Sequence, residues 1–356
     1  MKNDEYHGGL TSIDTLHVLE WPITRSRAKK IKEAMQGLVY ATWAKNQSAS
    51  ATIKIPTFQM SVKEDESISI FLQASGEVFD SSDTIQPSVV SFFQELLSAL
   101  QPVDPIRPGI IPRLVSDEDN LQLNQTPTLT EVREAIFSID PDSVTGPDGF
   151  SSHFFQVCCD IVSEDVFQVV LDFFVGGHLP KGFAATSIVL LPKRDNACRW
   201  SEFRPISLCT LFNKLITKLM NSRLSTLLPQ IISAPQSGFI SGRLIGDNVL
   251  LAQELLHTLD TKVGGGNVIL KLDMAKAYDR MDWSFLIFIM EGFGFDALWI
   301  DRIRRCISEC RFSILINGRP CGFFSSSRRL RQGDPISPSL FIIAADYFSR
   351  LLTQQY

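Results

Sequence analysis

Three aspartates stand close together in KLDMAKAYDRMDW, residues 271–283, and one of them is placed where a metal ion can be held. Asp273 follows the apolar residues Val268, Ile269, Leu270 and Leu272, a pattern that predicts a buried strand ending at this carboxylate. Metal-dependent phosphoryl transfer needs clustered carboxylates that hold two divalent ions about 3.5–4 Å apart, and hard oxygen ligands favour magnesium. Asp282 is interpreted as a helix cap and Asp279 as structural, which leaves open what completes the site.

Other polar and cationic residues are suited to hold a phosphate group. Gln332 and Gly333 precede a predicted helix, whose first backbone N–H groups can face a ligand. Lys193 follows a predicted strand, and Arg204 and Arg243 carry guanidinium groups suited to bidentate phosphate binding. For the Gln332-Gly333 motif taken alone, a structural loop is the favoured explanation. For each of the three cations taken singly, placement on the surface is the alternative explanation.

Composition and pattern divide the chain into three parts. Residues 1–75 are predicted to be a poorly ordered leader and linker with one basic amphipathic helix. Residues 76–127 are predicted to be an acidic connector with a short helix at Pro87–Leu100. Residues 128–356 carry dense patterns of both helices and strands, and this part is expected to hold the functional residues.

The third part combines helices with a few strands. Thr128 stands three residues before Glu131, which is the spacing of a capping box at a helix start. Asn317-Gly318 between two β-rich runs is the strongest short signal for a hairpin. The other expectations are a helix at 153–176, a strand at 188–193, a loop at 203–208 followed by a helix from Leu211, helices at 246–259 and 283–291, and a last helix that Ser337 caps and Pro338 begins. This mixture indicates an α+β architecture with a small antiparallel sheet.

Composition argues against several classes of protein. Hydrophobic residues make up 44% and charged residues 21% of the chain, as in ordinary globular proteins. The seven cysteines include no CxxC pair, which indicates reduced thiols and neither a disulfide framework nor a zinc site. No apolar signal core and no apolar run approaching about 20 residues is present, so neither secretion nor a membrane span is expected.

The net charge of -5 conceals an uneven distribution. Residues 61–170 hold 19 acids and 4 bases, whereas residues 181–250 hold 9 bases and 3 acids and residues 301–331 hold 8 arginines and 2 acids. Two basic blocks on either side of Asp273 suit a phosphate-rich ligand. Two solvated charged faces are an equally good explanation of the charge pattern alone.

Eight short motifs occur in one order along the chain and together resemble one family. They are GPDGF (146–150), LLPK (190–193), FRPISL (203–208), QSGFISGRLIGDN (236–248), LDMAKAYDRMDW (272–283), GFGF (292–295), INGRPCGFF (316–324) and LRQGDPISPSLF (330–341). Their order and spacing resemble the reverse transcriptase of plant non-LTR retrotransposons, the LINE type. The resemblance covers about residues 76–356 and is clearest from Thr128 onward.

The resemblance implies a right-hand polymerase fold with fingers and palm, here only part of the palm. It implies that Asp273 is the first catalytic ligand of Mg²⁺. Tyr278 matches the family position that crowds the sugar 2′ carbon and thereby selects deoxynucleotides. Lys193 and Arg204 match the fingers residues that contact the incoming triphosphate.

Two further parts of the site are implied by the same resemblance. Gln332 and Gly333 match the loop that positions the nucleotide and the template. Arg243 lies in a family motif and is assigned to nucleic-acid binding.

The chain also departs from the family pattern. The later aromatic–Ala–Asp–Asp turn, which bears the other metal carboxylates, is absent, as are the thumb and any endonuclease. Ala344-Ala345-Asp346 falls in the helix after RQGDP, too early in the chain to be that turn, and Asp346 is interpreted as a helix residue. Arg329 replaces a glycine that is usual in the family just before LRQGD, and the local turn is therefore expected to differ from that of the family.

The N-terminal part has a different resemblance. Residues 22–43, PITRSRAKKIKEAMQGLVYATW, are similar to a short segment of plant gypsy-class retrotransposon polyproteins. The chain is therefore interpreted as a fusion of two element remnants joined near residues 50–76.

These observations lead to one main expectation and two alternatives. The chain is expected to be a C-terminally truncated RNA-directed DNA polymerase module that does not polymerise alone. Its implied partners are an RNA template, a DNA primer and deoxynucleoside triphosphates, in the nucleus or cytoplasm and without a membrane; its oligomeric state is not indicated. The alternatives are a non-catalytic nucleic-acid-binding remnant of a transposable element and a decayed element without function.

Overall fold

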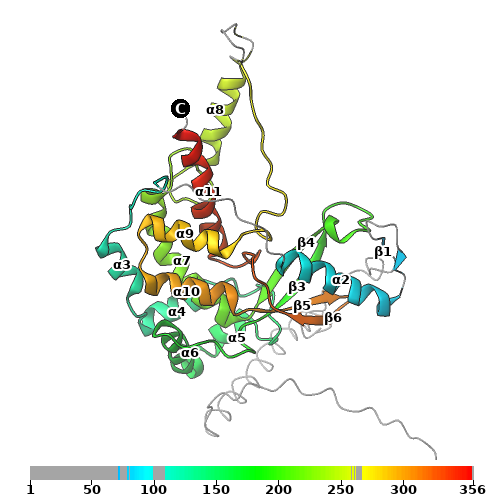
Figure 1. Ribbon diagram of the computed structural model, residues 1–356. Helices are drawn as coiled ribbons and strands as arrows, with labels where there is room; N and C mark the ends of the chain where they lie inside the picture. Colours follow the sequence, from blue (N-terminus) through cyan, green and yellow to red (C-terminus); the bar gives the residue numbers. More distant parts are fainter. Residues whose placement is uncertain are drawn as a thin grey trace, which may run out of the picture. The chain divides into compact units, whose positions relative to one another are not determined.

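The computed structural model describes residues 71–72, 78–79, 81–98, 109–257, 259, 261 and 267–354. All of them belong to the second of two compact units, Pro56–Tyr356. The helix expected in the N-terminal part and the similarity at 22–43 lie outside the described residues. The described part combines helices with a four-stranded sheet (Figure 1), as expected for mixed helix and strand content. None of its helices is both long and apolar enough to span a membrane.

The main sheet has the strand order β4-β3-β5-β6. β3 (Ala185–Pro192) pairs antiparallel with β4 (Phe203–Cys209) and parallel with β5 (Arg311–Ile316). The expectation of an antiparallel sheet is therefore wrong for the β3–β5 pair, because a long, mainly helical crossover connects these two strands. A separate two-stranded sheet joins β1 (Phe71–Leu72) and β2 (Val78–Phe79).

The predicted hairpin is confirmed. β6 (Arg319–Phe324) pairs antiparallel with β5, and the turn between them is Asn317-Gly318. Both turn residues have positive φ, 48° and 77°, as the favoured two-residue hairpin turn requires.

β4 occupies the segment at 203–208 for which a loop was predicted, so that prediction is wrong. Proline argued for a loop because it cannot donate a hydrogen bond to a neighbouring strand. β4 lies at the edge of the sheet, where Pro205 is tolerated. Phe203 and Pro205 are buried and Arg204 between them is exposed, which is the alternation of a strand.

Helix α2 (Ser82–Ser98) packs on the main sheet (Figure 1). Its apolar side chains recur every four residues and are buried in one core with β3, β5 and β6: Ile85, Val89, Phe93 and Leu97. The helix begins before the predicted Pro87, since the carbonyl of Ser81 accepts a hydrogen bond from the Ile85 N–H at 2.9 Å. Gly322 in β6 (φ 65°) allows close approach, because a Cβ there would lie 2.6 Å from Cγ2 of Val90.

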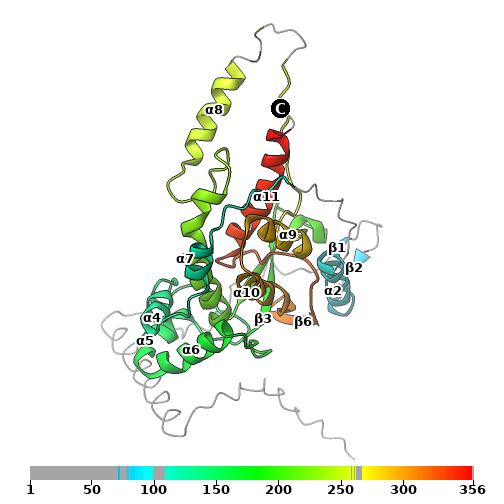
Figure 2. The same ribbon diagram turned by 60° about the vertical axis from the view of Figure 1, so that its left-hand side comes forward.

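Four of the other described helices pack around α7 (Leu211–Ile231), which lies to the left of the sheet in Figures 1 and 2. Its neighbours are α3 (Asp117–Asn124), α4 (Leu129–Phe137), α6 (Cys159–Phe174) and α11 (Ser337–Thr353). α9 (Trp283–Phe293) packs between α11 and α10 (Ala297–Ser308), and α5 (Ser152–Val157) packs on α4 and α6.

Helix starts were predicted well where a side chain caps them. The Thr128 hydroxyl accepts from the Glu131 N–H at 3.2 Å, as the capping box requires. The Asp282 carboxylate accepts from the Phe285 N–H at 2.9 Å and begins α9. Ser337 is the first residue of α11 instead of its cap, because the turn at Ile336 is already helical.

Three helical segments differ from the predictions. α3 lies in the predicted acidic connector at 76–127, where a helix was predicted only at Pro87–Leu100, and Ser116 caps it with Asp119. The single helix predicted at 153–176 is two helices, α5 and α6, separated at Cys158. No element was predicted where α10 lies.

The basic residues of α10 are mostly buried and hold the end of α6. Arg302 donates to the Phe174 carbonyl at 2.7 Å and stacks 4.8 Å from the centre of the Phe174 ring. Arg305 donates to the carbonyls of Phe173 and Gly177 at 2.8 and 2.6 Å. Cations placed at the C-terminal carbonyls of a helix are stabilising, so these arginines have a structural role.

We expect Arg302→Ala to lower the free energy of unfolding by about 2–4 kcal/mol, because it removes buried, charge-assisted hydrogen bonds and packing. Arg304→Ala is the matched control, since Arg304 is exposed on the same helix, and we expect a change within about 0.5 kcal/mol. Urea unfolding of both variants measures the difference. Equal effects would contradict a structural role for Arg302.

Candidate functional site

Asp273, the predicted metal ligand, is exposed and lies outside any strand. The buried strand predicted at 268–272 is wrong: Val268 and Leu270 are 80% and 81% exposed, and no strand among the described residues pairs with this segment. A strand needs a neighbour for its backbone N–H and C=O groups, and an apolar pattern alone does not provide one. No three histidine, cysteine or acidic side chains of the described residues group into a metal site. The assignment of Asp273 as a metal ligand stays a prediction.

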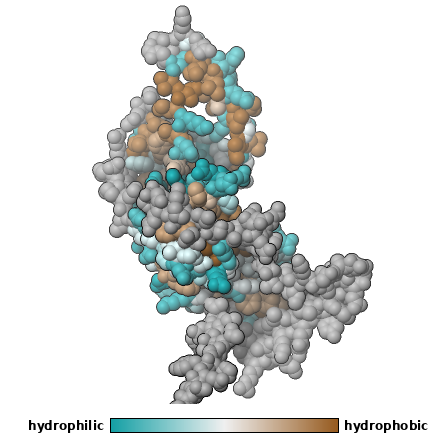
Figure 3. Space-filling model, turned by 90° about the vertical axis from the view of Figure 1, so that its right-hand side faces the viewer, coloured by the Kyte–Doolittle hydropathy of each residue, from teal (hydrophilic) through white to brown (hydrophobic). Residues whose placement is uncertain are grey.

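A broad apolar surface lies near this segment in the chain. α8 (Ile245–His257) was predicted as a helix, and it forms, but none of its residues is buried. Figure 3 shows hydrophobic residues gathered over this projecting part of the molecule. Its exposed apolar residues are Leu244, Ile245, Val249, Leu250, Leu251, Leu255 and Leu256. Contiguous apolar surface of this kind is typical of a face that contacts another segment or protein.

The turn after Asp273 is fixed by a buried ion pair. Asp279 is buried, and Nε of Arg329 lies 3.5 Å from its Oδ1. Burial raises the pKa of the Asp279 carboxyl, and the charge of Arg329 opposes that rise. Burial likewise lowers the pKa of the Arg329 guanidinium, against the opposing charge of Asp279. The structural interpretation of Asp279 agrees with these contacts.

Arg329 also shows how the turn accommodates the replacement of a glycine. Its φ is 115°, a backbone conformation that favours glycine. The side chain crosses to β4 and donates to the Pro205 carbonyl at 3.1 Å and to the Ser207 hydroxyl at 3.0 Å. Its own carbonyl accepts from the Trp283 indole N–H at 2.7 Å. The glycine-like backbone is thus retained, and contacts on both sides hold it.

Tyr278 is held from two sides, at the place where the resemblance puts a nucleotide-selecting residue. Its carbonyl accepts from the Leu330 N–H at 2.8 Å, and its ring stacks on Phe341 with 5.0 Å between centroids. Burial raises the pKa of the phenol, so the hydroxyl is neutral at physiological pH. The position of the ring is therefore fixed by packing against α11.

Lys193 and Arg204 lie at the same end of the sheet. Arg204 is opposite Leu191 in the β3–β4 pair, two residues from Lys193, and both side chains are exposed. The Lys193 ammonium donates to the Ser201 carbonyl at 3.0 Å. The structure thus brings together the two residues that were predicted to contact a triphosphate.

Gln332 and Gly333 lie beside the same edge strand. The Gln332 carbonyl accepts from the Ser207 N–H at 2.9 Å. Gly333 has φ 104°, and a Cβ there would lie 3.2 Å from the Ser207 carbonyl oxygen, so only glycine suits this approach. The RQGD loop is therefore attached to β4, one strand away from Lys193.

Two residues singled out in the sequence have contacts within the protein. Arg243 donates to four backbone carbonyls, those of Pro229, Ile232, Ser233 and Gln236, at 2.7–3.0 Å. It stabilises the loop after α7, and its binding to nucleic acid stays a prediction without support from these contacts. Asp346 is buried in α11 and accepts from the Ser233 N–H at 3.0 Å, which confirms its interpretation as a helix residue.

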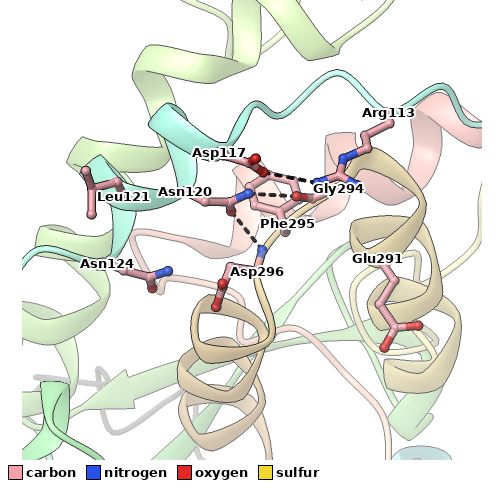
Figure 4. Close-up of a pocket in the computed structure, with 9 residues that line it drawn as sticks. All are labelled: Arg113, Asp117, Asn120, Leu121, Asn124, Glu291, Gly294, Phe295 and Asp296. Atoms are coloured by element: carbon pink, nitrogen blue, oxygen red, sulfur yellow. Dashed lines mark hydrogen bonds and ion pairs between the residues drawn. The ribbon is translucent and has the colours of Figure 1, made fainter.

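A cavity of about 470 Å³ lies between α3 and the turn from α9 to α10 (Figure 4). Asn120 spans it, donating to the Gly294 carbonyl and accepting from the Asp296 N–H, both at 2.8 Å. Asp117, Glu291 and Asp296 line the cavity and Arg113 is its one basic residue. None of the predicted site residues lines it, and its acidic character disfavours phosphate.

Comparison with known proteins extends these observations. Residues 191–356 match the family described as reverse transcriptase (RNA-dependent DNA polymerase). The uncharacterized 149 kDa protein of transposon TX1 from Xenopus laevis is 29% identical over 294 residues, 81% of this chain and 22% of that protein. The retrovirus-related Pol polyprotein from type-2 retrotransposable element R2DM of Drosophila melanogaster is 24% identical over 227 residues, 64% of this chain and 21% of that protein. An uncharacterized mitochondrial protein of Arabidopsis thaliana is 52% identical over 44 residues, 12% of this chain and 36% of that protein.

These matches relate residues 191–356 to a reverse transcriptase model, and the TX1 and R2DM relatives are proteins of transposable elements. More narrowly, the chain carries a retrotransposon reverse transcriptase module of the non-LTR type. The chain spans about a fifth of the length of the TX1 and R2DM proteins that it matches.

Sequence reasoning missed residues that shape the site. Phe92 of α2 lies before the family match, and its ring centre is 4.6 Å from the Lys276 ammonium. Lys276 stood inside the quoted stretch but was given no role, because it is neither acidic nor next to Asp273. The departure at Arg329 was noticed, yet its side-chain contact with Asp279 joins positions 50 residues apart and has no local sequence signal.

We expect Arg329→Gly to lower the free energy of unfolding by about 2 kcal/mol. Removal of one partner of a buried ion pair costs about 3–5 kcal/mol, while relief of the positive φ restores about 1–2 kcal/mol. The double variant Asp279→Asn/Arg329→Gly should recover most of this loss, because no unpaired carboxylate then stays buried. Denaturant titrations of the two single variants and the double variant form the cycle. A double variant no more stable than Arg329→Gly would contradict the coupling.

Proposed function

We propose that this chain forms the fingers and part of the palm of an RNA-directed DNA polymerase. Its nucleotide-facing residues are Lys193 and Arg204 at the end of β3–β4, Tyr278 packed against Phe341 of α11, and the Gln332-Gly333 loop. The observation that carries the proposal is one network of contacts. The Gln332 carbonyl and the Arg329 side chain bind β4, and the carbonyls of Tyr278 and Met281 accept from the backbone N–H groups of Leu330 and Arg329.

In the reaction proposed for the intact polymerase, the primer 3′ oxygen forms a bond to the nucleotide α-phosphorus. The bond from that phosphorus to the bridging oxygen of the β-phosphate breaks, and pyrophosphate leaves. The roles proposed for this chain are positional: Lys193 and Arg204 hold the triphosphate, and Tyr278 limits space at the sugar. RNA template, DNA primer and deoxynucleoside triphosphates are the proposed partners.

A pair of magnesium ions does not fit the donor set of the described residues. Asp273 is a single exposed carboxylate, and no group of three candidate ligands is found in the described part of the chain. The sequence contains no two consecutive aspartates. No catalytic step is therefore assigned to a metal here, and we propose that the chain does not polymerise DNA alone.

We expect the purified chain to extend no primer on an RNA template, with either magnesium or manganese. Asp273→Asn should give the same background incorporation as the natural sequence, because a single carboxylate supplies too few ligand atoms to hold two metal ions. An active reverse transcriptase in the same assay, and a cooperative thermal melt of the chain, are the controls. Incorporation that Asp273→Asn abolishes would contradict the proposal of inactivity.

A non-catalytic nucleic-acid-binding remnant is the second candidate. Four exposed cations near the β3–β4 turn favour it: Lys193, Arg194, Arg199 and Arg204. The basic block at 301–331 favours it less, since five of its eight arginines are buried: Arg302, Arg305, Arg328, Arg329 and Arg331. Affinity for an RNA–DNA hybrid that falls steeply with salt is the property that this candidate requires.

We also infer that the module derives from a plant element and acts in the nucleus or cytoplasm. The segment shared with the Arabidopsis thaliana protein supports a plant source. The resemblance of residues 22–43 to gypsy-class polyproteins is a separate proposal, and it falls outside the described residues.

A further inference from the structure

A cluster of charged groups lies where the turn after Asp273 meets α2 and the end of β3. Five cations and two carboxylates act on one another there: Lys193, Lys276, Arg280, Arg328 and Arg329, with Asp279 and Asp282. The cations outnumber the carboxylates, so the cluster has an excess of positive charge. Such an excess at a partly buried place favours the binding of an anion.

Both carboxylates already have contacts. Asp279 pairs with Arg329 at 3.5 Å. Asp282 caps α9 and lies opposite Arg328 in an isolated antiparallel bridge. Neither carboxylate is available to neutralise the lysines fully.

Arg280, which is exposed, is a further cation of the cluster; Lys193 and Lys276 are its two lysines, and both are left for a ligand. No carboxylate of the described residues lies within ion-pair distance of either ammonium group. Burial lowers the pKa of Lys276; the charge of Asp279 opposes this effect, and the charge of Lys193 adds to it. Two neighbouring ammonium groups repel each other, and a bound anion removes that repulsion.

Lys276 is also held in a specific place. Its backbone has φ 54°, a conformation that few non-glycine residues adopt outside functional sites and tight turns. Its ammonium lies 4.6 Å from the centre of the Phe92 ring, a distance at which a cation is attracted to the ring face. α2 therefore fixes the ammonium from one side and the turn fixes it from the other.

We propose that Lys276 is a positioning residue for the phosphates of a nucleoside triphosphate, which it binds together with Lys193, and that Phe92 of α2 holds its ammonium in place. This inference rests on the proposed function, in which Lys193 contacts the triphosphate. It extends the site to α2, a helix that precedes the family match at 191–356.

Calorimetric titration of the full chain with inorganic triphosphate and with dGTP, without metal, tests the inference. We expect Lys276→Ala to weaken the binding of both by about tenfold, because a charge-assisted phosphate contact is lost. Lys276→Arg keeps the charge and should stay within about threefold of the natural sequence. Phe92→Leu keeps apolar packing but removes the ring, and should weaken binding about threefold. Lys181→Ala removes an exposed lysine outside the cluster and should change nothing.

The outcomes separate this inference from the proposed function. If Lys193→Ala weakens binding and Lys276→Ala does not, the role of Lys276 is overturned and the proposed function stands. If the natural chain does not bind, or Lys193→Ala has no effect, the proposed nucleotide site is overturned and this inference with it. Thermal unfolding of each variant shows whether a substitution disturbs the structure. If Lys276→Ala lowers both the affinity and the unfolding midpoint, and Lys276→Arg restores neither, the effect is structural and the inference is overturned. A loss confined to dGTP would do so too, since Lys276 would then contact the sugar or base.

Discussion

The attachment of two loops to the edge strand β4 is the constraint on which the placing of the site residues depends. Arg329 is at its centre, because its side chain reaches both the Ser207 hydroxyl on β4 and the Asp279 carboxylate in the turn after Asp273. A buried guanidinium on a backbone with positive φ is costly. Contacts from β4, from Asp279 and from the Trp283 indole hold it in that state. The loops that carry Tyr278 and Gln332 are thereby fixed relative to the sheet.

The net charge does not show which of the basic residues are buried and which are exposed. The arginines of α10 are mostly used inside the protein, where Arg302 and Arg305 hold the carbonyls at the end of α6. Four exposed cations lie near the β3–β4 turn: Lys193, Arg194, Arg199 and Arg204. A nucleotide phosphate is therefore expected at the end of the sheet that carries Lys193 and Arg204, and less at the basic block as a whole.

Local signals in the sequence predicted local structure correctly. The Thr128 capping box, the Asp282 cap and the Asn317-Gly318 turn are all present, since each depends on residues within a few positions. Predictions failed where the structure of a segment depends on residues far away in the sequence. The apolar run at 268–272 has no neighbouring strand among the described residues, so it stays exposed. Pro205 is tolerated in β4 because this strand lies at the edge of the sheet. The local sequence does not show which strand lies at an edge, so a loop was predicted there. The sequence predicted Lys193, Arg204 and Gln332 as site residues, and these roles stay predictions. The contacts of Arg329 and Lys276 had no sequence signal, because they join segments far apart in the chain.

Amide hydrogen exchange tests the central claim most directly, namely that the two loops and β4 form one rigid unit. The amides that join them belong to Ser207, Arg329 and Leu330, which donate to the carbonyls of Gln332, Met281 and Tyr278 at 2.9, 2.9 and 2.8 Å. We predict that these three amides exchange slowly and with similar opening free energies, whereas those of the exposed segment 267–274 exchange without protection. Exchange of the three amides as fast as that of the exposed segment would contradict the account.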